Sequence, residues 1–112
     1  MDSILTSIKE SLGIHASHTH FDPQIIMHIN SVFADLAQMG VGHHSGFVIE
    51  DDTTLWTEFL QDALTLESVK SYMYLRVKLL FDPPLNSAVI ESMQHAIDKW
   101  EWRLNVAAET TD

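Results

Sequence analysis

A corner is built into this chain by the string Asp82-Pro83-Pro84, which separates two long amphipathic segments. Proline has no backbone N–H and disfavours helical geometry in the residue before it, so Asp82 and Pro83 are expected to be extended. Asn86 or Ser87 can accept hydrogen bonds from the first N–H groups of a new helix. The string therefore predicts that one helix ends at Asp82 and that another begins a few residues later, in a fixed direction.

Apolar residues recur at spacings of three and four along most of the chain, which predicts helices on both sides of the corner. The predicted helices cover about residues 2–12, residues 22–39, a short segment around residues 55–60, the segment from Thr65 to the corner, and a segment that starts near Asn86. The expected N-caps are Asp22 (with Pro23 in the first turn), one of Asp52, Thr53 and Thr54, and Thr65. This is the pattern of a mainly α, single-domain protein of 112 residues, a small bundle of four to five helices with a long C-terminal pair. Residues 1–20 form its N-terminal helix and a His-rich loop, and about residues 107–112 are expected to fray.

The apolar stripes of these helices predict the core. Before the corner the stripe residues are Ile4, Leu5, Ile8, Leu12, Ile25, Ile29, Val32, Phe33, Leu36, Leu55, Trp56, Phe59, Leu60, Val69, Tyr72, Met73, Arg76, Val77 and Leu80. After the corner they are Val89, Met93, Ala96, Ile97, Trp100 and Leu104. Residues two apart on a helix differ by about 200° around its axis, so Tyr74 and Trp102 should point away from these stripes. Such aromatic residues either cover the rim of the core or anchor a contact with another molecule.

The segment 40–51 is rich in glycine and contains the β-prone string Phe47-Val48-Ile49. One interpretation is a short strand that pairs with another subunit at its edge. The other is that these three residues cover the core between the second and third helices.

Sixteen acidic side chains against six basic ones give a formal charge of −10, with nine of the acids and only one base in residues 1–62. Binding of DNA phosphates needs clustered Lys and Arg, so this balance argues against a nucleic-acid-binding protein. The absence of cysteine excludes disulfides and thiolate metal sites. The N-terminus does not resemble a signal peptide, and no apolar run reaches the ~18 residues of a membrane span. We therefore expect a soluble, intracellular protein without a membrane partner.

Chemistry-bearing motifs are scarce. The string His15-x-x-His18-x-His20 offers three imidazoles to zinc, but no cysteine or HExxH helix supports it, and solvated loop histidines are the preferred interpretation. The three acids at 50–52 are interpreted as negative charge at the start of the third helix, rather than as a catalytic carboxylate pair. No GxSxG elbow or glycine-rich phosphate loop occurs. We expect no catalytic residue, metal ligand or cofactor.

Four strings carry a resemblance to a known family: HFDPQIIMHINSVFADLAQMGVG, GFVIEDDTTLWTEFL, LESVKSYMYLRVKLLFDPP and SAVIESMQHAIDKWEWRLN. In this order, from about His20 to Ala108, they resemble the small head–tail connector (head completion or adaptor) proteins of tailed bacteriophages and prophages. The most specific parts, Val77–Pro84 and Glu101–Leu104, carry no catalytic chemistry. The His-rich loop and the string GHHSG are not part of that pattern.

The resemblance implies a structural helical subunit without a cofactor, made in the host bacterial cytoplasm and incorporated into the neck of the virion. Such subunits join their own copies in a ring, commonly twelve-fold, under the portal protein. The ring extends the DNA channel and contacts the next completion (stopper) protein or the tail.

Two further expectations combine the resemblance with the residues. Trp100, Trp102, Arg103 and Leu104 are expected to dock on the portal, and the acid excess is expected to let DNA pass without specific binding. Two other classes stay open at this point: an acidic DNA mimic that inhibits a nucleic-acid-binding protein, and a small metal-dependent enzyme that uses the histidines.

Overall fold

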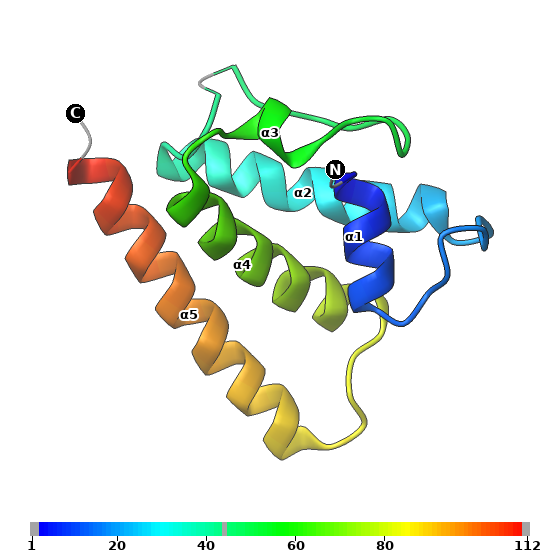
Figure 1. The fold of residues 1–112 in the computed structure, drawn as a ribbon. Coiled ribbons are helices and arrows are strands. Elements are labelled where there is room, and N and C mark those ends of the chain that lie inside the picture. The colour runs from blue at the N-terminus through cyan, green and yellow to red at the C-terminus, as the bar shows by residue number, and fades with distance from the viewer. Residues whose placement is uncertain (1–2, 44, 111–112) are drawn as a thin grey trace.

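The structure is a computed structural model that describes residues 3–43 and 45–110 (Figure 1). Over these residues the chain forms five helices and no strand, which confirms the predicted mainly α fold; a single antiparallel bridge joins Ser3 to Leu55. The helices are α1 (Ile4–Ser11), α2 (Asp22–Met39), α3 (Trp56–Phe59), α4 (Ala63–Phe81) and α5 (Ser87–Thr110). None of them combines the length and hydrophobicity needed to cross a bilayer, as far as the described residues go.

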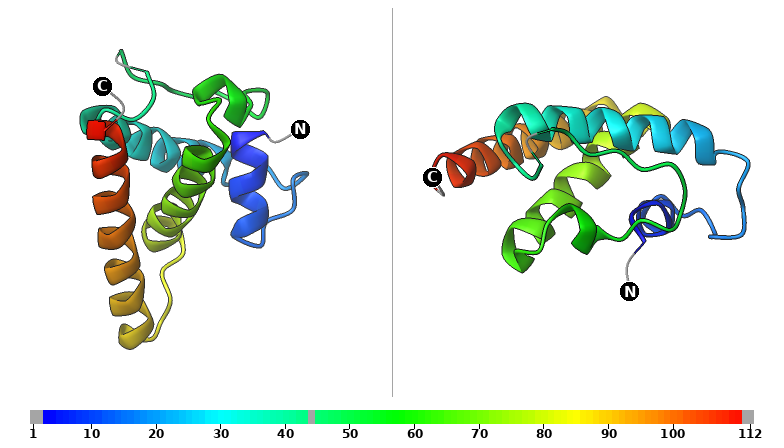
Figure 2. Two further views of the ribbon diagram at one scale, coloured as in Figure 1. Left: turned by 60° about the vertical axis from the view of Figure 1, so that its left-hand side comes forward. Right: turned by 90° about the horizontal axis from the view of Figure 1, so that it is seen from above.

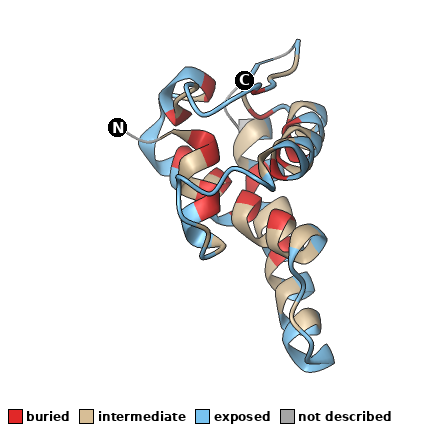
Figure 3. Cartoon of the chain, turned by 90° about the vertical axis from the view of Figure 1, so that its right-hand side faces the viewer, coloured by how far each residue is buried: buried red, intermediate tan, exposed pale blue. Residues whose placement is uncertain are grey.

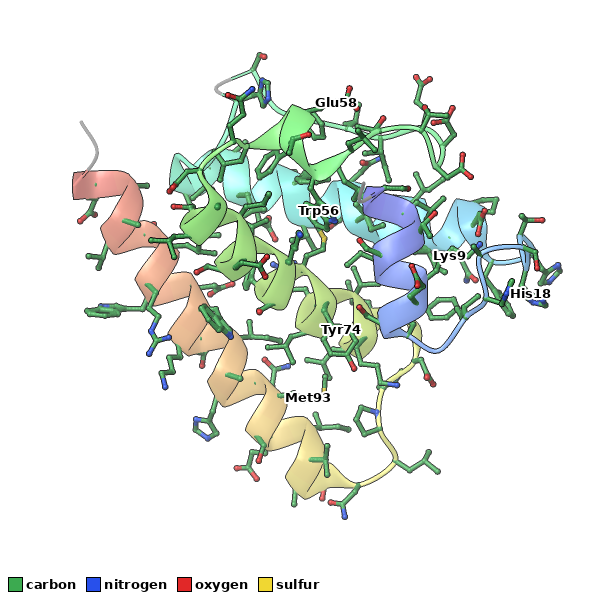
Figure 4. The ribbon with its side chains drawn as sticks, viewed as in Figure 1. Lys9, His18, Trp56, Glu58, Tyr74 and Met93 are labelled. Carbon is green, nitrogen blue, oxygen red and sulfur yellow. The ribbon has the colours of Figure 1, made fainter. Side chains whose placement is uncertain are left out.

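The centre of the fold is α4, which packs against α2 on one side and α5 on the other, while α1 lies against α2 and α4 (Figures 1 and 2). Trp56 is the first residue of α3, a helix of only four residues, and its side chain contacts three other helices (Figure 4). Its indole Nε1 donates to Ser7 Oγ of α1 at 2.7 Å, its ring lies 6.3 Å from that of Phe33 in α2, and Lys70 Nζ of α4 lies 5.8 Å from its centroid. The short α3 is therefore held in place by its aromatic side chains.

Helix boundaries agree with the sequence pattern better than the caps do. The helix α2 has the predicted range and ends at Gly40, which has a left-handed φ of 85°. However, Asp22 is its first helical residue, not its N-cap, because its carboxylate pairs with Lys9 Nζ of α1 at 2.8 Å. At the start of α5, the expected cap does form: Asn86 Oδ1 accepts from the N–H of Ala88 at 2.8 Å.

Two other predicted caps are wrong. The helix α3 begins at Trp56, after the three candidate caps, and the N–H of Leu55 donates to Glu58 Oε2 at 2.7 Å. Asp51 makes a local turn instead, accepting from the N–H of Thr53 at 2.9 Å, and hydrogen bonds from the Thr53 hydroxyl and N–H lower the pKa of Asp51. The acids at 50–52 therefore do not lie at the start of α3. The helix α4 begins at Ala63, two residues before the predicted cap Thr65, whose hydroxyl donates to the Asp62 carboxylate.

Most residues of the predicted stripes are buried or half-buried, but the core also includes Val41, Ile49 and Leu66. Tyr74, which was expected to point away from its stripe, packs against the core. The core consists of Ile4, Leu5, Ile8, Ile25, Ile29, Val32, Phe33, Leu36, Val41, Ile49, Trp56, Phe59, Leu66, Val69, Tyr72, Met73, Val77, Ile97 and Leu104. Leu80 and Val89 were expected in it, but they are 52% and 45% exposed. The reason is that the first half of α5 extends beyond the rest of the molecule, so no element covers its inner side there (Figures 2 and 3).

The corner lies between Phe81, where α4 ends, and Ser87, where α5 begins. Asp82 has φ −146° and ψ 67°, and its carboxylate accepts from Lys78 Nζ at 2.9 Å. At its C-terminal end, α5 remains helical through Thr110, although the helix was expected to fray from about residue 107. Ala108 explains part of this difference, because it packs against the core. Residues 111 and 112 lie outside the described residues.

We expect Gly42→Ala to destabilise the protein more than Gly46→Ala does. Both glycines have a left-handed φ, 85° and 90°, so alanine at either position costs about 1 kcal/mol. At Gly42 a Cβ would also lie 2.5 Å from Phe59 Cε1, whose ring is buried, whereas at Gly46 it would meet nothing within 4 Å. Gly42→Ala should therefore lose about 1–3 kcal/mol more in urea unfolding. Equal losses would show that the Phe59 ring is free to move.

Candidate interaction site on the C-terminal helix pair

A groove lies between the second half of α4 and the first half of α5, with a volume of about 460 Å³. We call it the α4–α5 groove. It is lined by Arg76, Leu79, Leu80, Pro83, Ile90, Gln94, Ile97, Asp98 and Glu101. Its walls are thus apolar next to the corner and charged farther along α5. The proline corner shapes the groove, because it separates the two helices at the end where they are joined (Figure 1).

The charged end of the groove is a hydrogen-bonded network across three helices. Arg76 of α4 donates from Nη2 to Asp35 Oδ2 of α2 and from Nη1 to the hydroxyl of Tyr72, at 2.7 and 2.6 Å. The Tyr72 hydroxyl in turn donates to Glu101 Oε2 of α5 at 2.7 Å. This network fixes α2, α4 and α5 relative to one another on the groove wall.

Two side chains of the network, Tyr72 and Arg76, have raised pKa values. Burial raises the pKa of Tyr72 above its ordinary value, and the hydrogen bond to Glu101 raises it further, so the hydroxyl remains a donor. Burial alone would lower the pKa of Arg76, but hydrogen bonds to Asp35 and Tyr72 outweigh it and the pKa is raised. The guanidinium therefore stays charged and committed to partners within the chain.

The side of α5 that faces away from α4 carries the exposed aromatic residue that the sequence predicted. Trp102 is 68% exposed, and the neighbouring Lys99 and Arg103 are exposed as well. Trp100 is half-buried, and the Arg103 guanidinium lies 5.2 Å from its ring centroid. Leu104 is 1% exposed and belongs to the core, so it is not available for docking. The structure thus brings Trp102 and Arg103 to the surface and removes Leu104 from the predicted set.

The comparisons with known proteins give one result. The sequence model of a family described as phage connector protein matches residues 4–111, nearly the whole chain. The chain belongs to this family. The search of curated proteins and the search of solved structures gave no match. Membership in the connector family confirms the resemblance seen in the sequence, and it assigns the chain a structural connector role in a phage, as a component of the virion.

The corner and α5 of this connector carry several exposed apolar side chains. Among the described residues, nine large hydrophobic side chains are exposed, and five of them lie on this part of the chain. They are Leu80, Leu85, Val89, Trp102 and Val106. Leu85, in the corner itself, is 105% exposed.

In the 40–51 loop of the connector, the structure agrees with the core-covering interpretation for two of the three residues. The Phe47 ring packs 5.1 Å from Phe33 and 5.2 Å from Phe59, and Ile49 is 2% exposed. The Ile49 N–H and carbonyl both bond to the Asn30 side chain, at 2.8 and 3.0 Å. Val48 is 66% exposed. Pairing of this segment with another subunit stays a prediction, and it would have to use backbone groups other than those of Ile49.

The histidines that the structure describes do not converge. No three His, Asp or Glu side chains in the described residues are placed to hold a metal ion together. In the His-rich loop, His15 Nδ1 lies 2.8 Å from Ser17 Oγ, while the rings of His18 and His20 lie 5.9 and 4.9 Å from that of Phe21. The loop is held by Lys9, which donates to the carbonyl of Ala16 at 3.0 Å (Figure 4).

Sequence reasoning missed the groove and its charged network. The available signal was Arg76, a charged residue in an otherwise apolar stripe of α4. A base at such a position needs a buried or half-buried acidic partner. The sequence offers many acids, however, and nothing in it identifies Asp35 and Glu101 as the two that approach Arg76.

Proposed function

We propose that this connector assembles into a ring of twelve copies under the portal protein, where it extends the DNA channel and joins the head to the next completion protein or the tail. Family membership supports the connector role, and the ring and its partners go beyond it. In this function the chain acts through shape and surface, without catalysis or a cofactor. The formal charge of −10 favours passage of DNA without specific binding, because phosphates are repelled.

The observation that carries this proposal is the set of large apolar side chains that are exposed on the corner and on more than one side of α5. A monomer leaves single hydrophobic residues in water without difficulty, but exposed tryptophan side chains are frequent anchors of protein interfaces. Leu85 and Trp102 are the most exposed members of this set, at 105% and 68%. They gain most if another protein covers them, because each Å² of apolar surface removed from water contributes about 25 cal/mol.

The proposal is tested by deleting the gene from an infectious phage that carries it. We expect heads that package DNA but carry no tails and lose their genomes, and a plasmid copy of the gene should restore tailed particles. Quantitative mass spectrometry of purified particles should find this chain and the portal subunit in equal copy number. Tailed, infectious particles from the deletion strain would contradict the proposal, as would absence of the chain from mature particles.

A further inference from the structure

We infer that neighbouring copies in the ring join through opposite sides of α5. The outward face of α5, defined by His95, Lys99, Trp102 and Val106, would lie in the α4–α5 groove of the next copy. This inference rests on the proposed function and names the two surfaces that form the subunit contact. It also gives Trp102 a partner other than the portal, namely a second copy of this chain.

Helical geometry places the apolar wall of the groove and the outward face on different sides of one helix. Lys99, Trp102 and Val106 follow one another at spacings of three and four and so share a face. Ile90 and Ile97 line the groove and lie about 120–180° around the axis from that face. Asp98, at the edge of the groove, lies only about 40° from Trp102 and so borders both surfaces. A surface and its complement on opposite sides of a subunit form a head-to-tail contact, and such contacts close into a ring when the rotation allows.

The charges of the two surfaces are complementary. The residues that line the groove include two acids, Asp98 and Glu101, and one base, Arg76. Arg76 pairs with Asp35 at 2.7 Å and lies 4.0 Å from Glu101, so Asp98 is the acid that has no ion pair within the described residues. On or beside the outward face are two bases, Lys99 and Arg103. None of the ion pairs found within the described residues involves Lys99, Arg103 or Asp98. Lys99 and Asp98 can therefore pair with another copy, as can Arg103, which lies over the Trp100 ring, and opposite signs meet when one copy follows the next.

The apolar parts also correspond. Trp102 is the largest exposed side chain of the outward face, and tryptophan flanked by a base is a common centre of protein interfaces. The groove offers it a wall made of Leu80, Pro83 and Ile90. Leu80 is 52% exposed, so this wall is open to a partner.

The absence of cysteine from the chain makes a crosslinking test direct. One variant carries Leu80→Cys in the groove, and the other carries His95→Cys on the outward face, with Trp102 intact. The two are mixed at high concentration and treated with a short bismaleimide that spans about two helical turns. Random pairing would give two mixed dimers for each homodimer of either variant. We expect the ratio of mixed dimers to either homodimer to exceed this value at least fivefold. Adding Trp102→Glu to the His95→Cys copy should reduce the yield of mixed dimers at least fivefold. Asp52→Cys, at an exposed position before α3, serves as the control cysteine outside the two surfaces.

The outcomes separate this inference from the proposed function. The inference is overturned if mixed dimers form only in the random proportion, or if their yield equals that obtained with the Asp52→Cys control. It is also overturned if Trp102→Glu does not change the yield of mixed dimers. If Trp102→Glu leaves the self-crosslink unchanged but prevents binding to the portal protein of the same phage, Trp102 docks on the portal instead. If mixed dimers form but the gene deletion does not affect tail attachment, the contact is supported and the proposed function is contradicted.

Discussion

Alanine in place of Trp56 should cost about 3–5 kcal/mol of the free energy of unfolding, the typical loss for a large aromatic residue removed from a core. Trp56 is 1% exposed and contacts three helices, and its removal also leaves the Ser7 hydroxyl without its indole donor. A domain of this size has a total stability of about 5–15 kcal/mol, so the loss is a large fraction of it. Urea unfolding followed by circular dichroism measures the effect as a fall in the transition midpoint.

Trp102→Ala is the matched control, because it removes the same side chain from an exposed position of the same molecule. Its effect on the free energy of unfolding of the isolated chain should stay within about 0.5 kcal/mol. Trp56→Phe should fall between the two, since it keeps much of the ring volume but loses the hydrogen bond. Similar midpoints for Trp56→Ala and Trp102→Ala would show that α3 does not hold the fold together as described.

The helices could be predicted because their signals are local. Periodic apolar residues identified all five, and proline and glycine identified the boundaries of α2 to the residue. The caps were harder, because an N-cap is a choice among competing partners. Asp22 is the example: its carboxylate pairs with Lys9, which is 13 positions away and on another helix. No local pattern contains that information.

The candidate site could be predicted only in part, because a hydrophobic stripe looks the same whether it faces the core or a second molecule. The spacing of two between Trp100 and Trp102 correctly predicted that Trp102 points outward. The same reasoning placed Leu80 and Val89 in the core, although α5 extends beyond the elements that would cover them. How far one helix extends beyond the others depends on the corner geometry, which the sequence only indicates.

Replacing Asp22 by asparagine should cost about 3–5 kcal/mol, because it leaves the ammonium group of Lys9 buried without its counter-charge. Lys9 is 2% exposed, and its remaining described partner would be the carbonyl of Ala16. A buried charge with a single neutral hydrogen bond is unfavourable, so the helix α1 should move away from α2. Urea unfolding measures the loss of stability, and amide exchange in residues 12–21 should become faster, because Lys9 no longer holds this loop.

A second ion pair of the same chain provides the control. Lys78 and Asp82 lie at a similar distance, 2.9 Å, but their side chains are 24% and 60% exposed, so Asp82→Asn should change the stability by at most about 1 kcal/mol. The double variant Lys9→Met, Asp22→Asn should recover much of the loss, because no unpaired charge remains and the methionine fills the same space. If Asp22→Asn proved no more harmful than Asp82→Asn, the burial of Lys9 would contribute nothing to the attachment of α1. If the double variant were less stable than Asp22→Asn alone, the loss would come from the start of α2, where an acid favours the helix dipole by about 0.3–1 kcal/mol, and from lost packing of the lysine chain.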